Sequence, residues 1–349
     1  LFDVAHFPIV PATGDPVVVT ARAHDPDGVD TVTLSYRIDP STTPTSLVMN
    51  DSGTGGDRVA GDGEYAATIP GQTSGVLAAF RLEAIDRQSN PATTVFPNDA
   101  PARECLVRWG DAVKPGSIPA YRIWMTQATF DTWTSRHNLD NTPHDITFVL
   151  GTQRVIYNAQ ALFAGSPYIA PGFSTPSGNR CGYSLVMPAD DVFLGDADLV
   201  LDWPGGHGNE RTAVQEQMAY WIADQIGLPF SLRHYIRLSV NGVTDMQRGG
   251  VFEAIIQPAG DFIDAWVPDD PDGDFYKIDR AFEFSDSGSV TADPMPTLEV
   301  FTTTGGAKKT ARYRWNWLKR SYDSAANYTN LFDLLAALKC EYPRQIHMI

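Results

Sequence analysis

Three aspartates in one glycine-rich stretch have the plainest potential for chemistry in this sequence. Asp51, Asp57 and Asp62 lie in MNDSGTGGDRVAGDGEYAATIPG, residues 49–71. Carboxylates carried on flexible loops are the ligands that hard cations such as Ca²⁺ require. The spacing fits no EF-hand loop, and Asp and Gly are also ordinary turn formers. The stretch therefore predicts either a calcium site or a well-formed turn.

A second candidate is a single carboxylate inside an apolar run. Glu253 lies between Phe252 and Ala254 in GGVFEAIIQ, residues 249–257. An acidic side chain in an apolar strand either points to water from the strand's other face or holds a ligand or partner. The sequence alone leaves both alternatives open.

A second acidic stretch is VPDDPDGDFYKID, residues 267–279. Asp270, Asp272 and Asp274 alternate in it, as calcium ligands can. The glycine of an EF-hand loop would fall on Phe275, however, which favours a tight turn that opens a strand.

A basic stretch, AKKTARYRWNWLKR at residues 307–320, is predicted to be a helix. In so acidic a chain it either receives an anionic partner or forms a solvated face paired with local acids, and we favour the second alternative.

Length and composition limit the function classes. With 349 residues, 43% of them apolar, the chain is long enough for two domains. Its net charge of −16 disfavours general nucleic-acid binding, because the phosphate backbone would repel it. It has no apolar run of about 18 residues, so we expect no membrane span. The opening LFDVAHFPIV, without Met, indicates a mature or trimmed segment of something longer.

Motifs of common enzyme classes are missing from the sequence. It contains no GxSxG, HExxH or P-loop motif, and its seven histidines show no metal-ligand spacing. Cys105, Cys181 and Cys340 lie far apart, and they form no zinc motif.

Residues 1–110 are predicted to be all-β. PVVVTARAHD, VDTVTLSYRID, GEYAATIPG and GVLAAFRLEAID alternate or are β-branched, and turn signals such as DPDG separate them. Strands at this spacing are typical of an immunoglobulin-like or fibronectin-like sandwich. DAVKPGSIP, residues 111–119, is predicted to be a linker.

Residues 120–349 combine strands and helices. Strands are predicted at YRIWMT, ITFVLG, RVIYNAQALF, GYSLVMP and ADLVLDW, and a helix capped by Thr126 at TQATFDTWTSRH. The clearest helix is NERTAVQEQMAYWIADQIGLP, residues 209–229, which Asn209 caps and Gly227 ends. Four apolar side chains repeat at four-residue steps on one face of this helix: Val214, Met218, Ile222 and Ile226.

The order of motifs after residue 120 resembles the CotH family of spore-coat-type atypical protein kinases. The matching motifs are Asn241-Gly242, then Gly250-Val251-Phe252-Glu253, then Gly273-Asp274-Phe275-Tyr276-Lys277. The resemblance covers residues 120–280. The loop at 49–71 also resembles one common in bacterial extracellular sandwich domains, and such a sandwich precedes CotH-like domains in large bacterial surface proteins.

The resemblance implies a multidomain fold class. An all-β immunoglobulin-like sandwich would precede an α+β, protein-kinase-like domain of the CotH type at 120–349, incomplete at its C-terminus. The implied cofactor is ATP with Mg²⁺ or Mn²⁺, and the implied activity is Ser/Thr phosphorylation of an extracellular protein. Glu253 would lie against the nucleotide base and Glu216 would face the cleft. Arg180 or Lys277 would reach the phosphates.

The chain departs from the family pattern in two places. Arg180 and Cys181 stand where family members carry a lysine-rich segment, and no stretch after residue 280 matches the family's catalytic and metal-binding acids. We therefore expect this chain to be inactive alone. One alternative is a non-catalytic extracellular structural, adhesive or filament-forming protein with a self-assembly partner. Another is a calcium-dependent binding module.

Overall fold

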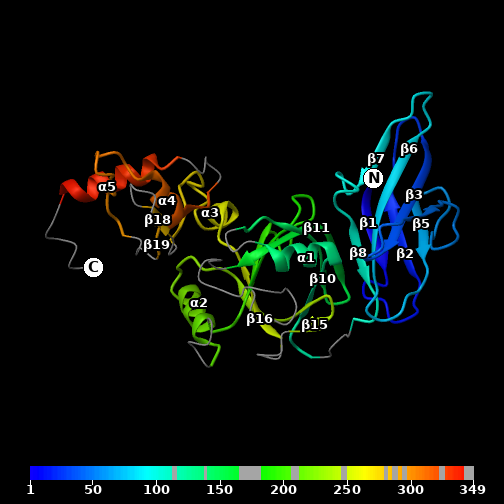
Figure 1. The fold of residues 1–349 in the computed structure, drawn as a ribbon, viewed down its shortest axis with the longest axis horizontal. Helices are drawn as coiled ribbons and strands as arrows, with labels where there is room; N and C mark the ends of the chain where they lie inside the picture. Colours follow the sequence, from blue (N-terminus) through cyan, green and yellow to red (C-terminus); the bar gives the residue numbers. More distant parts are fainter. Residues whose placement is uncertain are drawn as a thin grey trace. The chain divides into compact units, whose positions relative to one another are not determined.

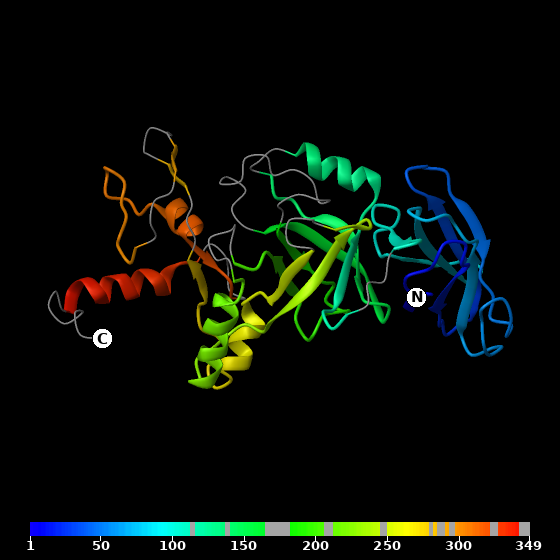
Figure 2. The same cartoon turned by 90° about the horizontal axis from the view of Figure 1, so that it is seen from below.

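The computed structural model describes residues 1–111, 116–136, 140–164, 182–205, 212–244, 250–278, 282–284, 290–292, 297–321 and 327–341. The chain divides into two compact units (Figures 1 and 2). The first comprises Leu1–Ile226 and Leu232–Ile256, and the second comprises Gly227–Ser231 and Gln257–Ile349. Among the described residues, no helix combines the length and the apolar character needed to cross a membrane.

The first unit begins with two antiparallel sheets around a shared core, coloured blue to cyan in Figure 1. The three-stranded sheet has the order β1 (Phe2–Phe7), β2 (Val17–Arg22), β5 (Glu64–Ile69). The five-stranded sheet contains β4 (Thr45–Val48), β3 (Val29–Ile38), β6 (Leu77–Asp86), β7 (Thr93–Phe96) and β8 (Cys105–Arg108). Both β7 and β8 pair with β6, one after the other along its length.

Alternation of apolar and polar residues explains these sheets. In β2 the side chains of Val17, Val19 and Ala21 are fully buried, and the residues between them are not. Leu34 of β3 and Phe80 of β6 meet them in the same core. Each sheet therefore buries one face against the other, as a two-layer sandwich requires.

Seven strands of the first unit then form a closed barrel. In order around it these are β9 (Ala120–Trp124), β10 (His144–Leu150), β11 (Arg154–Ala164), β12 (Gly182–Val186), β13 (Asp198–Asp202), β16 (Val251–Ile256) and β14 (Arg233–Val240). Neighbouring strands are antiparallel except that β14 pairs in parallel with β9, which closes the ring. The short β15 (Val243–Thr244) extends from β14.

The predicted α+β, protein-kinase-like domain is therefore wrong. Most strands expected between residues 120 and 260 do form, but they close into a barrel, and the chain is mostly β. Closure rests on register pairs such as Leu238 with Tyr121 and Val240 with Ile123. Partners so far apart in the chain leave no periodic signal in the sequence, and only local patterns support a prediction from one chain.

Asn241, at the end of β14, extends this closing contact. Its backbone N–H donates to the carbonyl of Ile123 at 3.0 Å. Its side-chain oxygen accepts from the N–H of Met125 at 3.0 Å, and its side-chain amide donates to the Met125 carbonyl at 2.9 Å. Asn241 has φ of +47°, a conformation that asparagine tolerates better than most residues. The Asn-Gly motif thus serves the barrel seam.

Two described helices accompany the barrel, α1 (Gln127–Ser135) and α2 (Gln215–Gln225). The prediction that Thr126 caps α1 is confirmed, since its hydroxyl accepts from the N–H of Thr129 at 3.1 Å. Trp133 of α1 is buried beside His144 and Tyr183 of the barrel wall.

The sandwich and the barrel share an apolar contact within the first unit. Leu77 and Leu106 of the sandwich pack with Trp124 and Val149 of the barrel. The Leu106 N–H donates to the Thr147 hydroxyl at 3.1 Å. Of the predicted linker at 111–119, residues 112–115 lie outside the described residues.

The second unit is smaller and contains three described helices, α3 (Gly260–Trp266), α4 (Thr310–Asn316) and α5 (Thr329–Glu341). Its strand pairs are β17 (Tyr276–Ile278) with β20 (Trp317–Lys319), and β18 (Phe282–Phe284) with β19 (Val290–Ala292). Its core is largely aromatic, formed by Tyr313, Trp317, Tyr328, Leu331 and Leu335.

Candidate functional site

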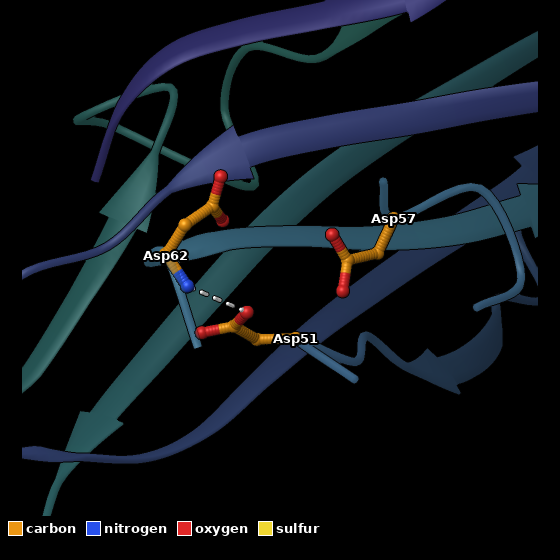
Figure 3. Close-up of side chains that lie close together, drawn as sticks. All are labelled: Asp51, Asp57 and Asp62. Atoms are coloured by element: carbon orange, nitrogen blue, oxygen red, sulfur yellow. Dashed lines mark hydrogen bonds between the residues drawn. The ribbon is translucent and has the colours of Figure 1, made fainter. Parts of the chain in front are cut away.

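The three aspartates of the glycine-rich stretch come together in one loop. Asp51, Asp57 and Asp62 lie between β4 and β5 of the sandwich, and Figure 3 shows their side chains facing a common space. One carboxylate oxygen from each lies within 4.8 Å of the others. The three carboxylates are thus close enough to share one ligand, and the predicted calcium site stays a prediction.

Backbone N–H groups hold the carboxylate of Asp51. Its Oδ1 accepts from Gly61 at 2.6 Å and from Asp62 at 3.2 Å, the bond dashed in Figure 3. Its Oδ2 accepts from Gly63 at 3.1 Å. Asp51 thereby fixes the path of the chain into β5, which is the turn-forming role expected of aspartate.

The other two carboxylates have fewer partners. Asp57 is buried, and it accepts from the N–H groups of Gly53 and, at 3.1 Å, Val59. Asp62 is exposed, and within the described residues its side chain accepts only from the N–H of Glu64, at 3.0 Å. This contact engages Oδ1 of Asp62 and leaves Oδ2 without a described protein partner.

Glycine holds this loop against the sandwich. Gly56 has φ of +109°, and a Cβ there would lie 2.5 Å from Cγ1 of Val18 on β2. Only glycine satisfies both the backbone conformation and the close approach. The spacing of the aspartates is therefore set by a loop that packs tightly on the sheet.

No positive side chain neutralises the three carboxylates within the part of the chain that the structure describes. None of them forms an ion pair with Lys, Arg or His there. N–H dipoles offset part of the repulsion among three like charges at this distance, but they carry no net charge. Three carboxylate oxygens this close together, with no described basic partner, could hold a hard cation.

Glu253 is the second candidate, and its side chain is only 1% exposed. It lies on β16, opposite Asp202 of β13 and Tyr235 of β14. Oε1 accepts from Nε2 of Gln217 at 3.0 Å, and Oε2 accepts from Nη1 of Arg233 at 3.1 Å. The alternative in which Glu253 points to water is therefore wrong.

Arg233 connects Glu253 to helix α2. Its Nη1 also lies 2.9 Å from Oε2 of Glu216, and its guanidinium carbon stacks 3.8 Å from the ring centre of Tyr220. Burial raises the pKa of Glu253, while the hydrogen bond from Gln217 and the charge of Arg233 oppose that rise. Two acids and one base thus form a polar attachment of the helix to the barrel wall.

The apolar face of α2 is exposed. No residue of the helix is buried, and the four apolar side chains that repeat along one face are all exposed. Its polar residues Glu216 and Gln217 face the barrel instead, because the buried charges of Arg233 and Glu253 require polar partners. The predicted cap Asn209 lies outside the described residues.

The residues predicted to bind a nucleotide are only partly brought together. Glu253 and Glu216 meet on Arg233, but both oxygens of Glu253 already have protein partners. Lys277 lies on β17 of the second unit, and Arg180 lies outside the described residues. The predicted binding of ATP with Mg²⁺ or Mn²⁺ is therefore not tested by these contacts and stays a prediction.

The two other charged stretches pair with one another in the second unit. Nζ of Lys319 lies 2.6 Å from Oδ1 of Asp274, and Asp274 also accepts from the Tyr276 hydroxyl at 2.9 Å. These bonds hold the pKa of Asp274 below its usual value against the effect of burial. Helix α4 ends at Asn316, so the predicted basic helix is shorter than expected. Lys319 of the basic stretch is thus paired with a local acid.

Sequence reasoning missed Arg233 and Gln217, the partners of Glu253. A basic residue at the start of an apolar run, as in SLRHYIRLSV, is a signal of the same kind as Glu253 itself. Both residues lie on other elements, far from Glu253 in the chain, so no sequence pattern indicates that they contact it.

Comparison with known proteins adds no relative. No family model, no curated protein and no solved structure matches this chain. The CotH resemblance therefore stays a prediction from motifs.

Proposed function

We propose that this chain is a calcium-binding structural or adhesive module that works outside the cell. The ion is held in the β4–β5 loop by Asp51, Asp57 and Asp62. The observation that carries the proposal is the approach of three carboxylates to within 4.8 Å of one another with no described basic partner.

The chemistry of the donors supports Ca²⁺ over other cations. All three side chains offer oxygen, which hard cations prefer, and the loop contains no described His or Cys ligand. Ca²⁺ accepts the irregular geometry and variable coordination number that a loop provides, whereas Mg²⁺ demands a near-ideal octahedron. Water and backbone carbonyls would complete the coordination shell.

The expected affinity supports an extracellular setting. Six hydrogen bonds from backbone N–H groups already occupy part of the carboxylate lone pairs, which weakens each carboxylate as a ligand. We therefore expect a dissociation constant of about 10⁻⁴ to 10⁻³ M, the range of extracellular calcium modules. Such a site is filled where calcium is millimolar and empty in a cytosol.

Thermal unfolding with and without calcium tests the proposal. After treatment with EDTA, Ca²⁺ at a hundred times its dissociation constant should stabilise the sandwich by about 2.7 kcal/mol, and Mg²⁺ should do so much less. The calcium shift should disappear in Asp62→Asn. An equal shift with both ions, or an equal shift in this variant, would contradict a site at these residues.

Asp25→Asn is the matched control. Asp25 is a half-buried aspartate of the same sandwich, and its Oδ1 accepts from the N–H of Asp27 at 2.8 Å. Asp62 makes the corresponding bond to Glu64, so each substitution removes one charge and keeps an acceptor for one turn hydrogen bond. We expect Asp25→Asn to retain the full calcium shift.

A further inference from the structure

A cleft with a volume of about 440 Å³ lies beside β3 and β6 of the sandwich, separate from the calcium loop. Three prolines contribute to its apolar lining, Pro40, Pro44 and Pro101, and Ala128 of helix α1 lines another part. The N–H of Gln127 donates to Oδ2 of Asp39 at 2.8 Å, which holds the start of this helix at the rim. The volume is within the usual range for small-molecule sites.

One of the two arginines that line the cleft is fully engaged. The guanidinium of Arg37 donates through Nε to Oε1 of Glu104 at 3.0 Å, and it forms a further bond through Nη2 to the same carboxylate. Its Nη1 donates to Oδ1 of Asp39 and to the carbonyl of Ser41, each at 3.0 Å. These contacts raise the pKa of Arg37, with the Glu104 hydrogen bond as the largest cause. Arg37 thereby pairs with both acids that line the cleft, Asp39 and Glu104.

The other arginine, Arg81, has no such partner. It alternates along β6 with the core residues Phe80 and Leu82, so it projects from the face that carries Arg37 and its cross-strand neighbour Ser35. Its side chain makes no ion pair or hydrogen bond with any residue that the structure describes, and it keeps all five of its N–H donors. The guanidinium of Arg81 is therefore the one in the cleft that keeps its hydrogen-bond donors free among the described residues, while the two arginines and two acids of the lining balance in formal charge.

We propose that this cleft binds a small carboxylic acid with an apolar body. The carboxylate pairs with the guanidinium of Arg81, whose fork matches two carboxylate oxygens. The apolar body lies against Pro40, Pro44 and Pro101. The acid is either a free organic acid or the C-terminal carboxylate of a short peptide.

The neighbouring acids favour a single negative charge on the ligand. Asp39 and Glu104 line the same cleft, and they would repel a phosphate dianion more strongly than a carboxylate. One free guanidinium offers a two-pronged partner to one carboxylate. A monoanion is thus the anionic ligand that the acids of the lining repel least.

Calorimetric titration with matched acids and amides tests this inference on the full chain. The probes are 3-phenylpropionate and N-acetyl-Phe-Pro with a free C-terminus, each compared with its uncharged amide. We expect at least one acid to bind about tenfold more tightly than its amide, the effect of one charge-assisted hydrogen-bonded pair. Binding by the free acid or by the dipeptide alone would identify which source of carboxylate fits.

Arg81→Gln is the decisive variant, because it removes the charge and leaves a side chain of similar reach. It should bring the affinity of the acid down to that of the amide. Arg22→Gln is the control, since Arg22 lies on the other sheet and pairs at the surface with Asp3 and Glu64. The inference is overturned if neither acid binds better than its amide, or if the preference for the acid survives in Arg81→Gln. Either result leaves the calcium proposal unaffected, since the two sites share no residue.

Discussion

Nη1 of Arg233 lies 3.1 Å from Oε2 of Glu253, and both side chains are almost completely buried, at 7% and 1% exposed. The two residues face each other from adjacent strands of the barrel, β14 and β16. The motif that resembles a nucleotide-binding strand is thus occupied by an internal ion pair. The pair attaches helix α2 through Glu216 and Gln217, so its role in this structure is to position a helix.

Removing Arg233 should destabilise the barrel strongly. Arg233→Met leaves Glu253 buried without its ionic partner, and breaking a buried pair from one side typically costs about 3 to 5 kcal/mol. Glu216 is 52% exposed, so Glu216→Gln should cost less than about 1 kcal/mol. Urea unfolding monitored by circular dichroism measures both changes. Similar losses for the two variants would contradict the assignment of Glu253 as the main partner of Arg233.

His6 should make stability depend on pH in the acidic range. It lies on β1, buried against Tyr157 of the barrel, and burial lowers its pKa to about 4. The unfolded state, with a pKa near 6.5, therefore binds more protons than the folded state between about pH 4 and 6.5. The free energy of unfolding should therefore be highest above that window. It should fall by about 3 kcal/mol as the pH drops through the window.

Urea unfolding at pH 7 and pH 4.5 measures the contribution of His6. His6→Gln should flatten the pH dependence across that window, and His24→Gln, at an exposed site in the same sandwich, is the matched control. A wild-type slope retained in His6→Gln would show that other groups cause it.

Asp145 should make stability depend on pH in the opposite direction to His6, so that stability falls as the pH rises. Its Oδ1 is buried without a hydrogen-bond partner, and burial raises its pKa to about 7. The folded state thus binds more protons than the unfolded state between about pH 4 and 7, so stability falls as the pH rises through that range. Asp145→Asn should stabilise the protein at pH 8 by about 2 to 4 kcal/mol and have little effect at pH 4. A variant that is less stable than the wild type at pH 8 would refute this.

Local patterns in the sequence predicted local features correctly. The alternation in PVVVTARAHD corresponds to the buried and half-buried residues of β2, and Thr126 caps α1 as expected. The cluster of Asp51, Asp57 and Asp62 was also predictable, because a short glycine-rich loop keeps its members close. In each case the residues that interact lie near one another in the chain.

The features that were not predicted depend on contacts between distant segments. Barrel closure pairs Leu238 with Tyr121, and Asn241 completes the seam through Met125. The apolar face of α2 is exposed, because the buried charges of Arg233 and Glu253 turn the polar side of the helix to the barrel. Burial of a charged pair overrides amphipathicity here, because unpaired charges inside a protein cost more than exposed apolar side chains.

Direct calorimetric titration of the EDTA-treated protein with Ca²⁺ tests the central claim, a calcium site formed by Asp51, Asp57 and Asp62. We predict one bound ion with a dissociation constant of about 10⁻⁴ to 10⁻³ M, at least about tenfold weaker binding in Asp62→Asn, and unchanged binding in Asp25→Asn. The absence of binding to the wild-type protein, or the same affinity in Asp62→Asn as in Asp25→Asn, would contradict it and leave the loop as a turn held by its own backbone.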